Sequence, residues 1–155
     1  MPPFYPIFLD LTGRRCVVIG GSQMAGEKAA RLLEYGADVV VIAPAACKEI
    51  VDLSDKECLT WIRRHYQNGD LEGACIAIVA DTGDAAIIDA VDSECRNRNV
   101  PLNVVDLPNS CTWIAPAVAR VGDVVVAVST GGASPALAKK MREEFQGVSR
   151  IKTKY

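Results

Sequence analysis

Three small residues, Gly20, Ser22 and Ala25, have the spacing of a dinucleotide-binding turn. In such a turn the first glycine makes the bend, the second lets the backbone approach the pyrophosphate, and the third position permits close packing of helix on strand. Alanine is an accepted variant at the third position, whereas Ser22 places a side chain where the pyrophosphate would press on the backbone. The spacing favours a dinucleotide cofactor, and the alternative is a turn whose glycines serve only the bend.

The strand expected after this turn lacks the second mark of a dinucleotide site. An acidic residue near its end commonly holds the ribose hydroxyls of NAD, and an Arg nearby accommodates the 2′-phosphate of NADP. The segment Val39–Pro44 contains neither residue type. This part of the sequence therefore does not discriminate between NAD and NADP.

The elements around the turn have the pattern of a βαβ unit. The apolar run Cys16–Ile19 predicts a strand, and apolar residues at helical spacing predict a helix through Glu34, with Gly36 just past its end. A second apolar run, Val39–Ile42, follows at once. Two strands joined in this way are expected to be parallel, with a right-handed connection.

The α/β alternation continues beyond this unit. The expected elements are a helix near 46–53, strands at 59–63 and 75–80, a helix over 84–97 and a strand over 100–105. After Pro108 no helices separate the apolar runs, which predicts antiparallel strands at one edge of the sheet, at 112–114, 118–121 and 124–129. A last helix is expected from about Pro135 to Phe145, with Ser134 as its N-cap.

The predicted fold class is α/β: a Rossmann-type NAD(P)-binding fold with a mostly parallel sheet, followed by antiparallel edge strands and a C-terminal helix. A chain of 155 residues, 50% of them hydrophobic, is long enough to bury one core. We expect one domain over residues 1–147 and a short basic tail at 148–155.

Composition and charge restrict the kind of partner. The chain has 17 basic and 19 acidic residues without a long basic cluster, so we expect no nucleic acid and no membrane as partner. It shows neither a leader pattern nor an apolar run long enough to span a bilayer, which predicts a soluble, unsecreted protein. Its six scattered cysteines fit reduced thiols in the cytoplasm. The only histidine, His65, is expected to be an exposed or capping residue.

Several segments, in order over nearly the whole chain, carry a family resemblance. They are Tyr5–Leu11, the Gly20-Gly21 turn with Ala25 and Lys28, Asn103–Asp106, Cys111–Ala117 and Ser129–Ala138. Glycine turns are common, whereas Asn-Val-Val-Asp followed by Ser-Thr-Gly-Gly-Ala-Ser-Pro before a helix is fairly specific. The chain thus resembles the precorrin-2 dehydrogenase/sirohydrochlorin ferrochelatase family, which includes the N-terminal module of siroheme synthase.

This resemblance implies the oxidation of precorrin-2 to sirohydrochlorin with NAD as cofactor. In bifunctional members it also implies insertion of ferrous iron, without a metal site built from protein ligands. Family members are usually homodimers, and the apolar strands after Pro108 offer edges that can pair across a two-fold axis. The expected partners are therefore a tetrapyrrole substrate, ferrous iron and a second copy of the chain.

By its position in the family motif, Asp106 is the expected catalytic residue. A carboxylate suits the chemistry, because dehydrogenation releases a proton and metal insertion needs deprotonated pyrrole nitrogens. Asp106 also follows an expected strand, at the end where open α/β sheets bind ligands. The alternative is a structural residue that caps the turn Asp106–Asn109, since Asp commonly fills such turns.

The other expected site residues follow from the same motifs. Those expected to bind the cofactor are Gly20, Gly21, Ser22, Gln23, Met24, Ala43, Pro44 and Thr82. Those expected to bind the substrate are Asn103, Ser129, Thr130, Gly131, Gly132 and Ser134. Two glycines before a helix expose N–H groups and a partial positive charge, which suits a substrate with many carboxylates.

Two other functions stay open. The first is a tetrapyrrole- or metal-handling, chelatase-like protein with weak or lost NAD binding, which Ser22 and Glu27 favour. The second is an interaction module without activity, for which the sequence offers no positive sign. The intact βαβ spacing favours the dehydrogenase.

Overall fold

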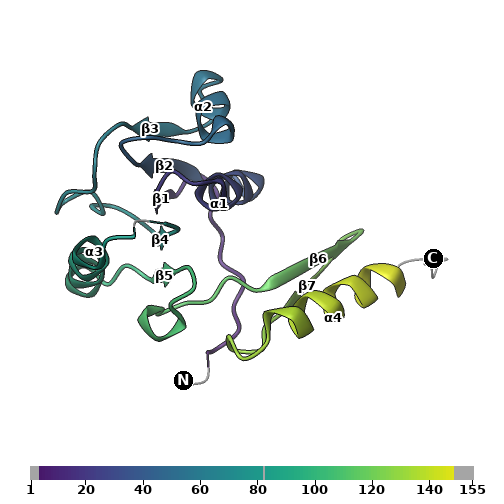
Figure 1. Ribbon diagram of the computed structural model, residues 1–155. Coiled ribbons are helices and arrows are strands. Elements are labelled where there is room, and N and C mark those ends of the chain that lie inside the picture. The colour runs from purple at the N-terminus through teal and green to yellow at the C-terminus, as the bar shows by residue number, and fades with distance from the viewer. Residues whose placement is uncertain (1–3, 82, 149–155) are drawn as a thin grey trace. The chain divides into compact units, whose positions relative to one another are not determined.

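The computed structural model describes residues 4–81 and 83–148, so Thr82 and nearly all of the predicted tail lie outside the described residues. The chain divides into two compact units (Figure 1). One unit consists of Pro6–Trp113, and the other of Met1–Tyr5 together with Ile114–Tyr155. The expected single domain over residues 1–147 stays a prediction.

The unit Pro6–Trp113 is an open sheet of five parallel strands in the order β3-β2-β1-β4-β5. Its elements are β1 (Arg15–Ile19), α1 (Gln23–Glu34), β2 (Asp38–Ile42), α2 (Lys48–Asp55), β3 (Thr60–Ile62), β4 (Ile76–Val79), α3 (Ala85–Arg98), β5 (Leu102–Val104) and the short 3-10 helix η1 (Pro108–Ser110). The predicted Rossmann-type parallel sheet is confirmed.

The central strands β1, β2 and β4 are apolar except for the first residues of β1 and β2, because both faces of the sheet are covered. On β1, Cys16 and Val18 pack in a core with α1 and α2, whereas Val17 and Ile19 pack in a second core with α3 (Figure 1). Burying one such aliphatic side chain stabilises the fold by roughly 1.5–3 kcal/mol. These cores therefore hold in place the strands that position the site.

The strand order switches direction between β1 and β4, so their carboxyl ends mark the switch point of the sheet. The chain builds β2 and β3 on one side of β1 and then crosses to β4 on its other side. Beyond the strands, the Gly20 N–H donates to the Ile42 carbonyl at 3.0 Å and the Ala80 N–H donates to the Ile19 carbonyl at 2.9 Å. Dinucleotides bind at such a switch of strand order in open α/β sheets.

The second unit contains a hairpin and a helix. β6 (Ala117–Val121) and β7 (Val124–Val128) pair antiparallel, and α4 (Pro135–Val148) packs on them. The predicted antiparallel pairing is confirmed, and the two strands form a sheet of their own instead of extending the parallel one. Ser134 caps α4 as predicted, since its Oγ accepts a hydrogen bond from the Leu137 N–H at 3.3 Å.

The predicted strand at 112–114 is wrong. The segment lies along β5 but bonds to it partly through a side chain: the Leu102 N–H donates to Thr112 Oγ1 at 2.7 Å, and the Thr112 N–H donates to the Leu102 carbonyl at 2.8 Å. Side chains that bond to backbone groups replace a regular ladder in this way. The segment thereby covers the outer edge of β5, which would otherwise be open to pairing.

Within the described ranges, no helix is both long enough and apolar enough to cross a membrane.

Candidate functional site

The glycine turn after β1 is packed against its own protein backbone. Gly20 has a φ of +120°, and a Cβ built on it would lie 2.6 Å from the Asp81 carbonyl oxygen. A Cβ on Gly21 would lie 1.8 Å from the Ala45 carbonyl oxygen. The Gly21 carbonyl also accepts a hydrogen bond from the Cys47 N–H at 2.7 Å. Both glycines are therefore required by the close approach of the loops that follow β4 and β2.

The first turn of α1 offers backbone donors to an anion. Ser22 is the N-cap: its Oγ accepts from the Ala25 N–H at 3.3 Å, and its carbonyl accepts from the Gly26 N–H at 3.0 Å. The N–H groups of Gln23 and Met24, the first in the helix, have no acceptor within it. Together with the partial positive charge of the helix N-terminus, they suit a pyrophosphate. Because the Ser22 hydroxyl accepts the Ala25 N–H, that third donor is not available to a ligand.

The end of β2 forms the neighbouring part of the candidate cofactor site. The Ala43 N–H donates to the Ile62 carbonyl at 3.2 Å, and the Ala43 carbonyl accepts from the Trp61 indole N–H at 3.0 Å. Pro44 follows and has neither an N–H nor a charge. The described residues thus fit a dinucleotide through the glycine turn and the helix start, and not through an acidic contact to the ribose.

Asp106 presents a carboxylate beyond β5, at the same edge of the sheet as the glycine turn. It is exposed, and its φ of +62° places it in the left-handed region, where Asp is enriched over most other residues. The Leu107 N–H donates to the Val104 carbonyl at 3.3 Å and closes the turn around it. Among residues 4–81 and 83–148, no hydrogen bond to its carboxylate is found. The turn holds this side chain at the surface.

Asn103 lies in a different environment from the one expected of a substrate-binding residue. It is 8% exposed within β5, and its Nδ2 donates to the Trp113 carbonyl at 3.1 Å. Beside it, Cys111 Sγ accepts from the Val104 N–H at 3.2 Å. These bonds hold the chain after η1 on β5 and so support the turn that contains Asp106. The role of Asn103 in substrate binding stays a prediction.

The loop before α4 is stabilised by its own hydroxyl groups. Ser129 Oγ accepts from the Gly131 N–H at 3.1 Å, and Thr130 Oγ1 accepts from the Ser134 N–H at 2.9 Å. Gly131 and Gly132 have φ of +64° and +88°, which L side chains adopt only with strain. A small cavity of about 160 Å³ opens here, lined by Ile114–Ala117, Val128, Ser129, Thr130, Gly132, Pro135 and Ala138.

The predicted site residues are distributed over the two units. The unit Pro6–Trp113 brings the glycine turn, Ala43, Pro44 and Asp106 to the carboxyl edge of its sheet. The residues Ser129–Ser134 belong to the other unit. The role of this loop in substrate binding stays a prediction.

Sequence reasoning missed the residues that follow β3. The guanidinium of Arg63 lies over the Trp61 ring, 4.4 Å from its centroid, and Arg64 forms a bidentate ion pair with Asp70 at 2.8 and 2.7 Å. The bond between Ala43 and Ile62 brings them beside the end of β2. The available signal was the parallel pairing itself, because adjacent parallel strands end at the same edge of a sheet.

A buried carboxylate anchors the loop that follows these residues. Glu94 on α3 is 3% exposed and accepts hydrogen bonds from the Tyr66 hydroxyl, the Gly69 N–H and Arg98. Burial raises the pKa of Glu94, but the three donors outweigh it and hold the pKa below its usual value. Burial first, and then the bond to Glu94, raise the pKa of Tyr66. The network ties the loop after β3 to α3 by charge-assisted hydrogen bonds.

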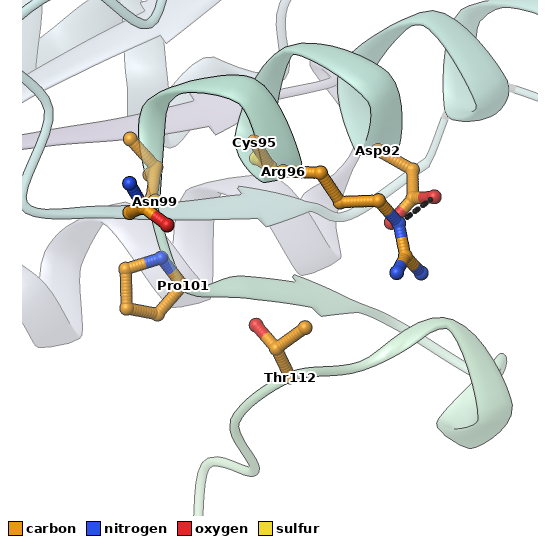
Figure 2. Close-up of a pocket in the computed structure, with 7 residues that line it drawn as sticks. Asp92, Cys95, Arg96, Asn99, Pro101 and Thr112 are labelled. Carbon is orange, nitrogen blue, oxygen red and sulfur yellow. Dashed lines mark hydrogen bonds and ion pairs between the residues drawn. The ribbon is translucent and has the colours of Figure 1, made fainter.

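A cavity of about 380 Å³ lies between the end of α3 and the start of β5 (Figure 2), lined by Asp92, Cys95, Arg96, Asn99, Val100, Pro101 and Thr112. Arg96 pairs with Asp92, one turn earlier on α3, at 2.8 Å. Because the cavity lies at the amino end of the strand, it is remote from the edge where open α/β sheets bind ligands. We therefore do not assign it to the candidate site.

The remaining reactive side chains form no second site in the described part of the chain. No group of three His, Cys, Asp or Glu residues there is arranged to hold a metal ion. His65 is exposed, as expected, and the six cysteines are free.

The open parallel sheet and the glycine turn at its switch point define the class of protein, a Rossmann-type dinucleotide-binding fold. Comparison with known proteins agrees. A family model described as putative NAD(P)-binding matches residues 7–117, and one described as sirohaem biosynthesis protein central matches residues 122–147.

Individual relatives narrow this class. The chain is 41% identical over 143 residues to the siroheme synthase of Methylococcus capsulatus, covering 92% of this chain and 30% of that protein. It is 37% identical over 147 residues to the siroheme synthase of Nitrosospira multiformis, covering 92% and 31%. The chain thus spans less than a third of the length of these curated relatives.

This chain covers a larger share of one solved structure. The structure of "SirC, precorrin-2 dehydrogenase" matches with a TM-score of 0.81 and 30% identity, over 94% of this chain and 71% of that one. The chain belongs to the precorrin-2 dehydrogenase family, with the putative NAD(P)-binding domain of residues 7–117. The resemblance inferred from its motifs is confirmed.

Proposed function

We propose that this protein is an NAD-dependent dehydrogenase that oxidises precorrin-2 to sirohydrochlorin in siroheme biosynthesis. The observation that carries the proposal is the exposed carboxylate of Asp106 at the same sheet edge as the glycine turn. A proton acceptor and a site for a hydride acceptor at one edge are what such an oxidation needs. The likeness to SirC, which is named as a precorrin-2 dehydrogenase, supports the choice of substrate.

The reaction removes two electrons and two hydrogens from the tetrapyrrole, one as a hydride and one as a proton. Bound NAD supplies the acceptor for the hydride. The N–H groups of Gln23 and Met24 bind its pyrophosphate, at a turn that Gly20 and Gly21 keep narrow. A carboxylate oxygen of Asp106 accepts the proton, and its exposure lets the proton pass on to water.

The proposal extends to the remaining partners. The glycine loop Ser129–Ser134 binds carboxylates of the tetrapyrrole at the N-terminus of α4. Asp106 also serves insertion of ferrous iron, as a second activity, by accepting protons from pyrrole nitrogens. The protein acts as a homodimer, and its free cysteines fit the reducing cytoplasm.

The test combines anaerobic turnover with a matched pair of variants. The protein is mixed with NAD and precorrin-2, and the formation of NADH and sirohydrochlorin is followed by absorbance. Asp106→Asn should lower turnover at least about 100-fold, the range of a lost acid–base group, with an unchanged Kd for NAD. Asp89→Asn makes the same change at an exposed position of α3 and should leave turnover unaltered.

Two results would count against the proposal. Full turnover by Asp106→Asn would remove the proton acceptor from the mechanism. A protein that binds the tetrapyrrole but neither binds nor reduces NAD would instead support the chelatase-like alternative.

A further inference from the structure

We propose that Arg63 lets this protein accept NADP as well as NAD, by binding the 2′-phosphate on the adenosine ribose. The inference rests on the proposed function, because it assigns a part of the same cofactor site. It begins with the register of the strands: Val41 pairs with Trp61 and Ile42 with Ile62, in parallel. The carboxyl ends of β2 and β3 therefore meet at the ligand edge of the sheet.

The contact between these two ends is closed by hydrogen bonds. Ala43, the first residue after β2, donates its N–H to Ile62 at 3.2 Å and accepts the Trp61 indole N–H at 3.0 Å. Arg63 follows Ile62 directly, so its backbone starts beside Ala43. That is the position at which a dinucleotide site holds the ribose, and where an Arg accommodates a 2′-phosphate.

Arg63 is held at this position and its charge is free. Its guanidinium stacks on the Trp61 ring, 4.4 Å from the centroid, and Trp61 is itself fixed by its bond to Ala43. Stacking by a guanidinium face leaves its N–H groups, which lie in the plane, available to a phosphate. Arg63 is exposed, and in the described part of the chain no carboxylate pairs with it.

The neighbouring arginine is already engaged. Both terminal nitrogens of Arg64 bind the Asp70 carboxylate, and one of them also donates to the His65 carbonyl at 2.9 Å. Arg64 therefore supports the loop, whereas Arg63 is available to a ligand. The two adjacent arginines differ in role although the sequence alone gives them the same environment.

The charges around Ala43 favour binding of the 2′-phosphate. Sites that select NAD place a carboxylate at the end of β2, which holds the ribose hydroxyls and repels a 2′-phosphate. Here the uncharged Ala43 stands there, beside the cation of Arg63. Of the carboxylates on the surrounding elements, Glu49 accepts from Gln23 Nε2 at 3.2 Å, Asp70 is paired with Arg64, and Asp81 follows β4, which β2 and β1 separate from β3.

The test is a calorimetric titration of the full chain with NAD and with NADP. The wild-type Kd for NADP should lie within about tenfold of that for NAD, a difference below about 1.4 kcal/mol. Arg63→Gln should weaken NADP at least about tenfold and NAD by less than about twofold. Arg63→Lys should retain part of the affinity for NADP, since it keeps the charge without the planar fork. Arg31→Gln removes a charge at an exposed position of α1 and serves as the control.

The outcomes separate this inference from the proposed function. Binding of NAD with NADP more than about 100-fold weaker would overturn the inference and leave the dehydrogenase proposal standing. An equal loss of both cofactors in Arg63→Gln would also overturn it, because the residue would then only position Trp61. Failure of the wild-type protein to bind either dinucleotide would refute both.

Discussion

Gly21 is the residue with the least room in the candidate cofactor site. An alanine Cβ there would lie 1.8 Å from the Ala45 carbonyl oxygen, so the loop after β2 would have to move. We expect Gly21→Ala to lower the free energy of unfolding by more than about 3 kcal/mol, as measured by urea denaturation. Gly13→Ala is the control: its φ of +65° is unfavourable for alanine but no atom lies within 4 Å, so the cost should be about 1 kcal/mol. If both variants lost the same free energy of unfolding, the Ala45 carbonyl would have to lie farther from Gly21 than the structure places it.

The cysteines differ in reactivity according to their burial. Burial raises the pKa of the Cys16 thiol to about 11 and that of Cys95 to about 12, whereas Cys58 is exposed. Because the thiolate is the reacting form, a maleimide at about pH 8 should label Cys58 at least about tenfold faster than Cys16 and Cys95. Mass spectrometry of timed samples measures this order. Rapid labelling of Cys95 would show that α3 opens from the sheet in the native state.

At the scale of the element, the start of α1 has two tasks: it needs a cap for the helix, and it offers N–H groups to a pyrophosphate. Ser22 affects both. The Ser22 hydroxyl caps the helix through the Ala25 N–H, and that N–H is then unavailable to a pyrophosphate. We expect Ser22→Gly to tighten NAD binding severalfold at a stability cost of only a few tenths of a kcal/mol. Ser22→Ala is the comparison and should lower stability by about 1 kcal/mol. Calorimetric titration and urea denaturation measure the two effects, and an unchanged Kd in Ser22→Gly would show that the free donor adds nothing.

The elements that the sequence predicted are those determined by local chemistry. Ser134 and Gly36 mark helix ends, because a cap and a positive φ depend on neighbouring residues only. The segment after η1 failed as a strand because Thr112 bonds to β5 through its hydroxyl, which an apolar run does not reveal. Arg63 was missed for a related reason: its place beside Ala43 follows from the register of β2 and β3, which depends on distant residues.

At the scale of the whole molecule, the site depends on a network outside it. The loop after β3 is held by Asp70, which binds Arg64, and by Glu94, which binds Tyr66. The hydrogen bond from Arg64 is the main cause that lowers the pKa of Asp70 below 3.8. Hydrogen bonds similarly hold the pKa of Glu94 below 4.5 against the effect of burial. This loop begins with Arg63 and is bonded to α3 through Glu94. The stability of the network therefore affects how Arg63 is positioned at the edge of the sheet.

The sign of these shifts predicts how stability changes with pH. A carboxyl with a lowered pKa in the fold stabilises it above the unfolded value, and this contribution is lost as the pH falls through the folded value. The free energy of unfolding should therefore decline once the pH drops below 4.5, the ordinary value for Glu94, and further below 3.8, that for Asp70. Asp70→Asn should lower stability at neutral pH and make the acid decline shallower, because this titration is removed. Asp89→Asn, at an exposed position, should leave the wild-type curve unchanged. Urea denaturation over this pH range decides: an acid decline as steep in Asp70→Asn as in the wild type would show that the Arg64 pair contributes nothing to it.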